Sequence, residues 1–456
     1  MKHWEACISH RRFGYQPSTT QPMRSEFMRD YDRIIFMSAF RRLQDKTQVF
    51  PLPGNVFVHN RLTHSLEVAS VGRSLGLIVG NKIAEILTYE FSFGIPGFYK
   101  HELAGVIASA CLAHDVGNPA FGHSGEKAIS HFFESNADCI INGRSLQSHF
   151  SDREWLDLIH FEGNANALRL LTKQFQGRLP GGHTLMMLTL ASILKYPCAS
   201  HEIDKKHIRT KKYGYFQSDK AAFEAIIEEF SMKNADGTIM RHPFVYLVEA
   251  ADDICYRIID MEDAHRIGIL SREQIETHFI KLLVQLKVQT SRTKEVLRRI
   301  SDDNEAVSFL RAKCIHALVN TCADIFFENR EKILNGSFNK SLMDVVEAKC
   351  KALKDIEKIS VQKIYNHPSV IEVEMAGYNV MSEILSVFVK AMITENKNSF
   401  QKKTLLLIPD QYNLSASNTS PYEKTMGVLD FVSGMTDGYA TEMYRRIKGI
   451  EIPAHK

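Results

Sequence analysis

The stretch HELAGVIASACLAHDVGNPAFGHSGE, residues 101–126, says most about the fold of this chain. Its first half is apolar at nearly every position and predicts a buried helix over residues 101–114. An Asn-Pro turn then breaks this helix before a second helix opens near Ser124. The pair His114 and Asp115 therefore stands at the end of a helix that belongs in the core.

Segments with apolar residues at helical spacing lie on both sides of this stretch. They predict helices over residues 24–48, from about Arg61, over 185–195, over 243–264 and over 428–447. Pro51, Pro53 and Gly54 predict a loop after the first of these helices, and residues 409–424 read as a polar loop. Because alternating apolar runs are few, we expect an all-α, mostly helical fold.

The sequence changes character at about residue 270. From there to about 400 it consists of long charged helices without a cluster of chemically competent residues. We therefore expect a catalytic core with an N-terminal substrate segment over 1–265, a helical scaffold or assembly region over 266–400, and a C-terminal segment over 401–456 that packs back on the active site.

Composition indicates a globular protein and leaves its partner open. Of the 456 residues, 44% are hydrophobic and 24% charged, which excludes wholesale disorder. The net charge of +3 does not favour a polyanionic partner. The eight cysteines form no C-x-x-C pair, and the longest apolar stretch, residues 185–194, is too short to span a bilayer. With no signal-peptide core at the N-terminus, these features predict reduced thiols, no membrane association and a cytoplasmic location.

Four residues from distant parts of the chain form a candidate ligand set for one divalent cation: His64, His114, Asp115 and Asp252. Imidazole and carboxylate donors suit Mn²⁺, Fe²⁺ or Mg²⁺ better than Zn²⁺, and an octahedral ion would keep positions open for water and a phosphate oxygen. A lone His-Asp pair is more often an ordinary hydrogen-bonded pair. Here both halves of the set lie in apolar surroundings, where an unpaired carboxylate is costly and a cation compensates it.

Helical spacing adds further side chains to this site. Asp252, Tyr256 and Asp260 stand at i, i+4 and i+8, which places two carboxylates and an aromatic ring on one helix face. Taken by itself, each such group of residues could equally form a salt bridge or a helix cap on the protein surface.

Two more pairs show a spacing of three. Arg61 and His64 place a guanidinium beside a candidate ligand, where it can bind a phosphate. His123 and Glu126 place an imidazole where a carboxylate can orient it for proton transfer. The convergence of these groups favours a catalytic site over separate surface pairs.

Eight strings show a resemblance to a known family. RSEFMRDYDRI, FRRLQDKTQVFPL, HNRLTHSLEV, HDVGNPAFGHSGE, FEGNAN, ILKYP, EAADDICY and GMTDGYA occur in this order. Together they resemble the bacterial deoxyguanosine triphosphate triphosphohydrolases of the HD superfamily, most densely over residues 24–265 and weakly over 270–400. The resemblance implies an HD-type helical core elaborated by additional helices. It also implies removal of intact triphosphate from a deoxynucleoside triphosphate, dGTP above all.

The resemblance also implies residue roles. His64, His114, Asp115 and Asp252 match the family's metal ligands. Asp253 is rejected as a ligand because the ligand must share the helix face of Tyr256. His123 and Glu126 match the catalytic His and its acidic partner, which assist attack of water at the α-phosphorus.

Substrate contacts follow from the same resemblance. Gln48 is expected to face the sugar 3′-hydroxyl, and Asp260 is a second sugar contact. Tyr256 would pack against C2′ of the deoxyribose and exclude a ribose hydroxyl. Base contacts are expected from the C-terminal segment, where Tyr439 and Arg445 are candidates.

Cationic residues for the triphosphate are also implied. They are Arg61, Lys195 and Lys212, with Lys211 as an alternative to Lys212. Two other interpretations of the basic run over residues 205–212 stay open, namely a solvated face and a contact with single-stranded nucleic acid. Relatives also suggest a homo-oligomer, with a hexamer as one form, and activation by a second, allosteric dNTP.

Two other functions stay open at this point. An HD-type phosphodiesterase or nucleotidase could use the same four metal ligands together with a second metal bound by His123 or His160. The chain could also be a non-catalytic nucleotide-sensing or nucleic-acid-binding protein with the same fold. The presence of His123 and Glu126 beside the candidate metal ligands argues against this, because a binding protein does not need residues for proton transfer.

Overall fold

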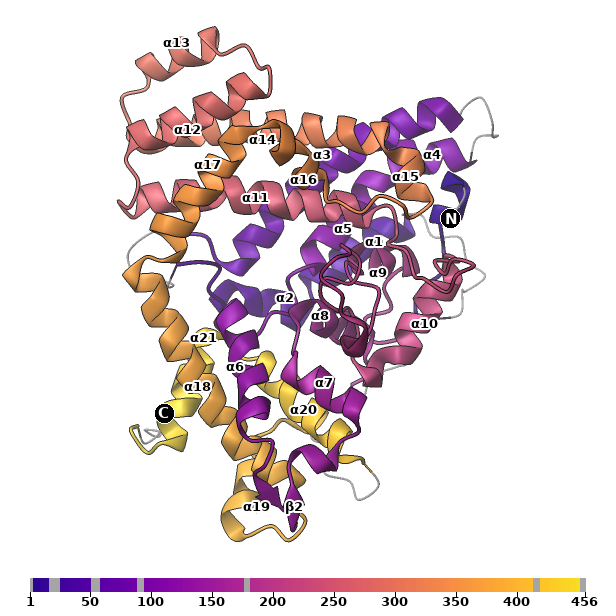
Figure 1. Ribbon diagram of the computed structural model, residues 1–456, viewed down its shortest axis with the longest axis vertical. Coiled ribbons are helices and arrows are strands. Elements are labelled where there is room, and N and C mark those ends of the chain that lie inside the picture. The colour runs from indigo at the N-terminus through magenta and orange to yellow at the C-terminus, as the bar shows by residue number, and fades with distance from the viewer. Residues whose placement is uncertain are drawn as a thin grey trace.

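In the computed structural model, three helices form the centre of the fold: α3 (Arg61–Leu87), α5 (Leu103–Ala113) and α11 (Val245–Arg266) (Figure 1). Helix α5 is almost entirely apolar and is buried at every position except Ala104 and Gly105, which are half-buried. Helix α3 packs along both α5 and α11, and α9 (Met187–Ile193) packs on α5. These are the helices that apolar periodicity predicts, and their existence is confirmed.

The structure describes residues 3–15, 25–50, 58–87, 94–175, 181–412 and 419–451. The expected loop at Pro51, Pro53 and Gly54 lies outside these residues. The segment predicted as one helix over 24–48 is divided into α1 (Glu26–Ile35), α2 (Ser38–Arg42) and a 3-10 turn, Leu43–Asp45. Further helices around the centre are α4 (Gly94–His101), α6 (Gly122–Ser135), α7 (Asp152–Ile159), α8 (Gly163–Thr172) and α10 (Lys220–Glu229).

The second half of the chain covers the centre at both ends of the long axis. The upper part of Figure 1 holds α12 (Arg272–Gln285), α13 (Ser291–Arg299), α14 (Asp303–Glu328), α15 (Arg330–Leu334), α16 (Leu342–Lys349) and α17 (Lys351–Ile359). Helix α14 packs on α3, α11 and α12. A π-helical turn, Ser360–Tyr365, leads into α18 (Pro368–Ile393), which runs down along α6.

The lower part also holds the C-terminal helices. They are α19 (Ser399–Leu405), α20 (Pro421–Ser433) and α21 (Asp437–Ile447), and α18 packs on all three. A small antiparallel pair, β1 (Ile140–Ile141) and β2 (Arg144–Ser145), lies at the bottom of the view. Buried residues from all parts of the chain belong to one hydrophobic cluster, and the domain boundaries at 265 and 400 stay predictions.

The C-terminal segment differs from the prediction of a single helix over 428–447. The first helix begins earlier, because Ser420 and Glu423 form a reciprocal capping box around Pro421. It ends at Ser433, and Thr436 then caps a separate helix by accepting from the backbone N–H of Tyr439 at 3.3 Å. The predicted polar loop over 409–424 is therefore shorter than expected.

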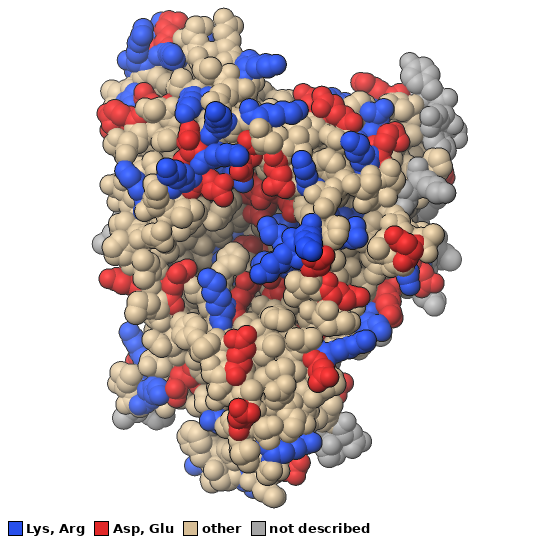
Figure 2. All heavy atoms as spheres, viewed as in Figure 1, with Lys and Arg blue, Asp and Glu red and all other residues tan. Residues whose placement is uncertain are grey.

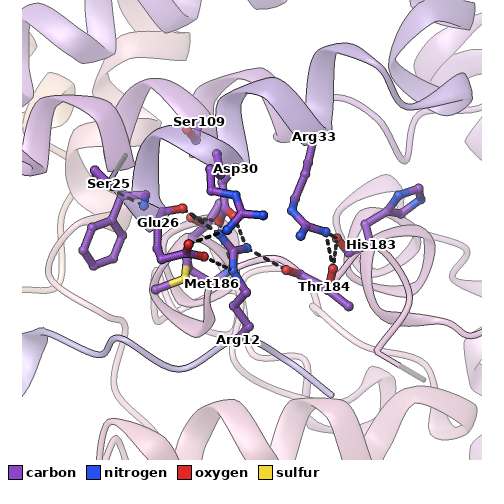
Figure 3. A network of polar contacts seen from close by, with 12 residues as sticks. Arg12, Ser25, Glu26, Asp30, Arg33, Ser109, His183, Thr184 and Met186 are labelled. Atoms are coloured by element: carbon purple, nitrogen blue, oxygen red, sulfur yellow. Dashed lines mark hydrogen bonds and ion pairs between the residues drawn. The ribbon is translucent and has the colours of Figure 1, made fainter. Parts of the chain in front are cut away.

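The N-terminal segment is attached to the core by a buried ionic network (Figure 3). The guanidinium of Arg12 contacts Asp30 at 2.7 Å and Glu26 at 2.6 Å. Asp30 also accepts from the N–H of Met186 and the hydroxyl of Thr189. These bonds connect the N-terminal segment, α1 and the start of α9, so they fix the helix that leads toward Gln48.

The surface is mixed in charge. On the face drawn in Figure 2, Lys and Arg side chains lie among Asp and Glu side chains, with one group of basic side chains near the centre. None of the described helices is both long and apolar enough to cross a bilayer. None of the eight cysteines, all of which lie in the described parts of the chain, takes part in a disulfide.

Candidate metal centre and active site

Three of the predicted ligands come together between α3, α5 and α11. His64 lies in the first turn of α3, His114 directly after α5, and Asp252 in the second turn of α11. Their candidate ligand atoms all lie within 4.8 Å of one another. Asp252 Oδ1 is 3.2 Å from His64 Nε2 and 3.5 Å from His114 Nε2. We refer to these three residues as the donor triad.

The chemistry of the donor triad fits a divalent cation. The Nδ1 of His114 lies 2.6 Å from the carbonyl oxygen of Cys111, and because a carbonyl only accepts, Nδ1 carries the proton. His114 Nε2 is buried, has no hydrogen-bond partner and belongs to the atoms that gather within 4.8 Å of one another, so it faces the other two donors. This arrangement, with one ring nitrogen held by a carbonyl and the other directed at a shared point, is typical of metal-binding histidines.

Electrostatics around the triad also favour a positive charge. Burial lowers the pKa of His114, but the carboxylates of Asp115 and Asp252 outweigh it and raise that pKa to about 9. Burial likewise opposes ionisation of Asp252, yet His114 and His64 hold its pKa well below the usual range. A bound cation would satisfy the same carboxylates.

Asp115, the fourth predicted ligand, lies beside the triad but is held by other groups. Its Oδ2 accepts from Arg61 Nη1 at 2.7 Å, and its Oδ1 accepts from the Asn118 amide. His114 Nε2 is 3.7 Å from Asp115 Oδ1. The sequence places the Arg61 guanidinium beside His64 and ready for a phosphate, whereas in the structure it forms an ion pair with Asp115.

Close packing at the start of α6 depends on a glycine. Gly122 has a φ of +56°, which favours glycine, and a Cβ at this position would collide with the Arg61 guanidinium. The Nε of Arg61 is buried without a partner. Arg61 therefore stands between the triad and the first turn of α6 with donor capacity to spare.

His123 and Glu126, the predicted proton-transfer pair, line one large cavity of about 1010 Å³. Burial, Arg61 and Lys212 lower the pKa of His123. Burial and the Glu162 carboxylate raise the pKa of Glu126 to about 7.

The expected contact between these two side chains does not form. In the described part of the chain no hydrogen bond joins His123 to Glu126, and Glu126 Oε1 instead accepts from the N–H of Gly163 at 2.8 Å. A Cβ on Gly163 would lie only 2.5 Å from Glu126 Oε1, so glycine lets the carboxylate approach the backbone.

Both predicted phosphate-binding lysines are paired with carboxylates that the sequence analysis missed. Lys195 Nζ lies 3.3 Å from Glu249 Oε1, and Lys212 Nζ lies 2.8 Å from Glu162 Oε2. A small cavity of about 40 Å³ next to the triad is lined by His114, Asp252, Lys195, Glu249 and Asn164, among others. The only available signals were the FEGNAN string and the position of Glu249 three residues before Asp252.

Lys211, the alternative to Lys212, is exposed and lines the large cavity, as does His160. Asp253, which the helix-face argument rejects, is outside the donor triad. Burial raises the pKa of Asp253 to about 7, and Lys195 opposes this rise.

Two of the predicted sugar contacts, Tyr256 and Asp260, are both in contact with Tyr365, which the sequence analysis did not identify. Tyr256 is 38% exposed, and its ring stacks on Tyr365 at 5.5 Å with an interplanar angle of 13°. The Tyr365 hydroxyl donates to Asp260 Oδ2 at 2.7 Å. Burial holds the pKa of Asp260 well above its usual range, and the bond from Tyr365 lowers it. Tyr365 belongs to the region 270–400, for which no chemistry was predicted.

Gln48 is not brought into contact with the other predicted sugar contacts. Its Oε1 is buried and lacks a hydrogen-bond partner, and in the described chain it makes no hydrogen bond to Tyr256 or Asp260. The two candidates for base contacts are placed elsewhere. Tyr439 lines a separate cavity of about 310 Å³, and Arg445 pairs with Glu451 at 3.8 Å on the surface.

Comparisons with known proteins agree with this architecture. A model described as the HD domain matches residues 61–196, and one described as a phosphohydrolase-associated domain matches residues 342–446. Proteins named deoxyguanosinetriphosphate triphosphohydrolase-like are 34% identical in Synechocystis sp., over 98% of this chain and 100% of the relative, and 36% identical in Pseudomonas aeruginosa, over 99% and 100%. A Yersinia enterocolitica protein named deoxyguanosinetriphosphate triphosphohydrolase is 31% identical, over 93% of this chain and 94% of its own. The resemblance seen in the sequence is thereby confirmed, and the chain belongs to the deoxyguanosinetriphosphate triphosphohydrolase family of HD-domain proteins.

Proposed function

We propose that this protein hydrolyses deoxynucleoside triphosphates, dGTP among them, to a deoxynucleoside and inorganic triphosphate in a metal-dependent reaction. The observation that carries the proposal is the donor triad beside the Arg61–Asp115 pair, with unpartnered nitrogens on both His114 and Arg61. The names of the relatives support the substrate class.

The donor triad, together with Asp115, would hold the cation. When bound, a divalent ion supplies Lewis-acid activation of water and of a phosphate oxygen. Mn²⁺, Mg²⁺ and Fe²⁺ all suit these donors.

Arg61, Lys195 and Lys212 would bind the triphosphate. Each is now paired with a carboxylate, so an incoming polyanion shares or replaces Asp115, Glu249 or Glu162 as the partner. The carboxylates hold the cationic groups in place before substrate arrives, which lowers the cost of ordering them.

His123 and Glu126 would move the protons. Attack of water on the α-phosphorus breaks its bond to the deoxyribose 5′-oxygen, so one proton leaves the water and one reaches that oxygen. The lowered pKa of His123 keeps the imidazole neutral and able to accept. The pKa of Glu126, about 7, keeps part of its population protonated and able to donate.

Product analysis tests this proposal. The protein is incubated with Mn²⁺, Mg²⁺ or Fe²⁺ and with each deoxynucleotide, singly and in pairs, with GTP as the ribonucleotide control. Equal amounts of deoxyguanosine and inorganic triphosphate from dGTP are expected. Pyrophosphate or monophosphate would indicate the phosphodiesterase or nucleotidase alternative. No turnover, together with nucleotide binding that survives Asp115→Ala, would indicate a sensing protein.

Three further features belong to the proposal. The chain is proposed to divide into a catalytic core (1–265), a scaffold (266–400) and a C-terminal segment (401–456). It is also proposed to assemble as a homo-oligomer, which light scattering tests with and without pairs of nucleotides. Retention of single-stranded DNA that falls steeply with salt would show that the basic run 205–212 contacts nucleic acid.

A further inference from the structure

We propose that Asp437 is a positioning residue that holds the catalytic end of α6 and the Gln48 segment in fixed relation to each other. This inference rests on the proposed function, because it concerns the same site. Asp437 lies in the GMTDGYA string, which the mechanism above leaves without a role.

One carboxylate bridges two segments that are far apart in the chain. Asp437 Oδ1 accepts from the N–H of Phe121 at 2.9 Å, and its Oδ2 accepts from the N–H of Thr47 at 2.8 Å. Asp437 is only 8% exposed. Each of these amides lies close in sequence to a proposed functional residue, since Thr47 precedes Gln48 and Phe121 stands two residues before His123.

The carboxylate does not serve its own helix. An acidic residue in the first turn of a helix usually stabilises the N-terminus of that helix. In α21 Thr436 already does so, because its hydroxyl accepts from the N–H of Tyr439. Asp437 is therefore free to bind the two neighbouring segments.

Both amides belong to backbone that needs support. Phe121 has a φ of 60° and a ψ of 17°, a left-handed conformation that is unfavourable for a large side chain. Residues 46–50, the described residues that follow the 3-10 turn, form no helix, and Thr47 forms an isolated bridge to Asn60 just before α3. Asp437 therefore connects the entry to α6 with the entry to α3.

Neighbouring bonds converge on the same junction between α20 and α21. Lys46 Nζ donates to the Ser433 carbonyl at 2.9 Å and to the Asn118 carbonyl at 2.6 Å. Asn166 Nδ2 donates to the Gly117 carbonyl at 2.7 Å and lies 3.3 Å from Ser433 Oγ. The junction thus contacts the loop that follows His114 at several points, and the bond from the Phe121 N–H to Asp437 is one of them.

The test compares Asp437→Asn with Asp430→Asn. The first variant keeps the size of the side chain but turns an N–H₂ toward one of the two backbone donors, so one bond is lost. The second variant changes another buried carboxylate of the same junction region, which pairs with Arg169 and Lys173 and not with the backbone of Thr47 or Phe121. Both variants are measured for kcat and KM with dGTP and with 2′,3′-dideoxyGTP, for thermal stability and for hydrogen exchange of peptides covering Thr47 and Phe121.

We expect Asp437→Asn to speed exchange in both peptides and to lower kcat for dGTP by about 10- to 100-fold, the size of effect that a displacement near 1 Å can produce. We also expect its preference for dGTP over the dideoxynucleotide to fall, because Gln48 shifts. Asp430→Asn should lose stability with unchanged exchange in these peptides and an unchanged preference. The inference is overturned if Asp437→Asn behaves like Asp430→Asn in exchange and preference. If the wild-type protein hydrolyses no deoxynucleotide, the proposed function fails, while the exchange data still decide whether Asp437 holds the two segments.

Discussion

The Tyr365 hydroxyl offers a sharp test of the sugar site. Replacing Tyr365 by Phe removes the 2.7 Å bond to Asp260 and keeps the ring that stacks on Tyr256. Because the raised pKa of Asp260 favours the uncharged acid, this bond joins two neutral groups, and such a bond contributes about 0.5–1.5 kcal/mol. Since 1.4 kcal/mol corresponds to tenfold, loss of this bond predicts a fall in kcat/KM for dGTP of roughly 2- to 10-fold if Asp260 binds the 3′-hydroxyl.

The assay measures triphosphate release from dGTP and from 2′,3′-dideoxyGTP. We expect Tyr365→Phe to affect dGTP strongly and the dideoxynucleotide little, because only dGTP offers a hydroxyl to Asp260. Tyr246→Phe is the matched control, since its hydroxyl donates to the Phe338 carbonyl at the same 2.7 Å and also lies on a buried contact of α11. Equal losses on both nucleotides, or wild-type kcat/KM in Tyr365→Phe, would refute the reasoning.

Two further predictions concern stability. Burial lowers the pKa of His59, but Asp263 and Glu67 raise it to about 10, well above the ordinary value of 6.5. The native state therefore holds a proton on His59 that the unfolded state releases near its ordinary pKa. The stabilisation that protonated His59 provides is complete below about pH 6.5 and is lost as the pH rises through 10. The urea midpoint of unfolding should therefore fall between pH 7 and 10 in the wild type and much less in His59→Gln. Arg169 is buried between the carboxylates of Asp430 and Asp219. Arg169→Met removes the guanidinium that pairs with both carboxylates. The free energy of unfolding measured by urea titration should therefore fall by about 3–5 kcal/mol. A loss below 1 kcal/mol would show that this network is replaceable.

Much of the helical core could be predicted because buried helices carry apolar residues at regular helical spacing in the sequence. Helices α5 and α11 are apolar over whole turns, so their positions followed from composition and spacing. The three members of the donor triad were identified because a His or Asp at the end or in the middle of such a helix is conspicuous.

Features that depend on contacts between distant segments could not be predicted in this way. Glu162 and Glu249 pair with lysines about 50 residues away in the chain, and a short-range sequence pattern does not predict such a partner. Tyr365 reaches Asp260 through a π-helical turn after α17, which spacing rules for α-helices do not describe. Apolar periodicity alone does not show the break between α20 and α21, which Thr436 marks as an ordinary capping residue. Ser420 and Pro421 are the corresponding signals for the start of α20.

Binding of Mn²⁺ to chelator-treated protein tests the central claim most directly. Calorimetric titration should find one ion per chain in the wild type, no binding in Asp252→Asn and wild-type binding in Asp253→Asn, because of these two aspartates Asp252 is the one that lies beside His64 and His114. Retention of the ion by Asp252→Asn, or its loss from Asp253→Asn, would contradict the account.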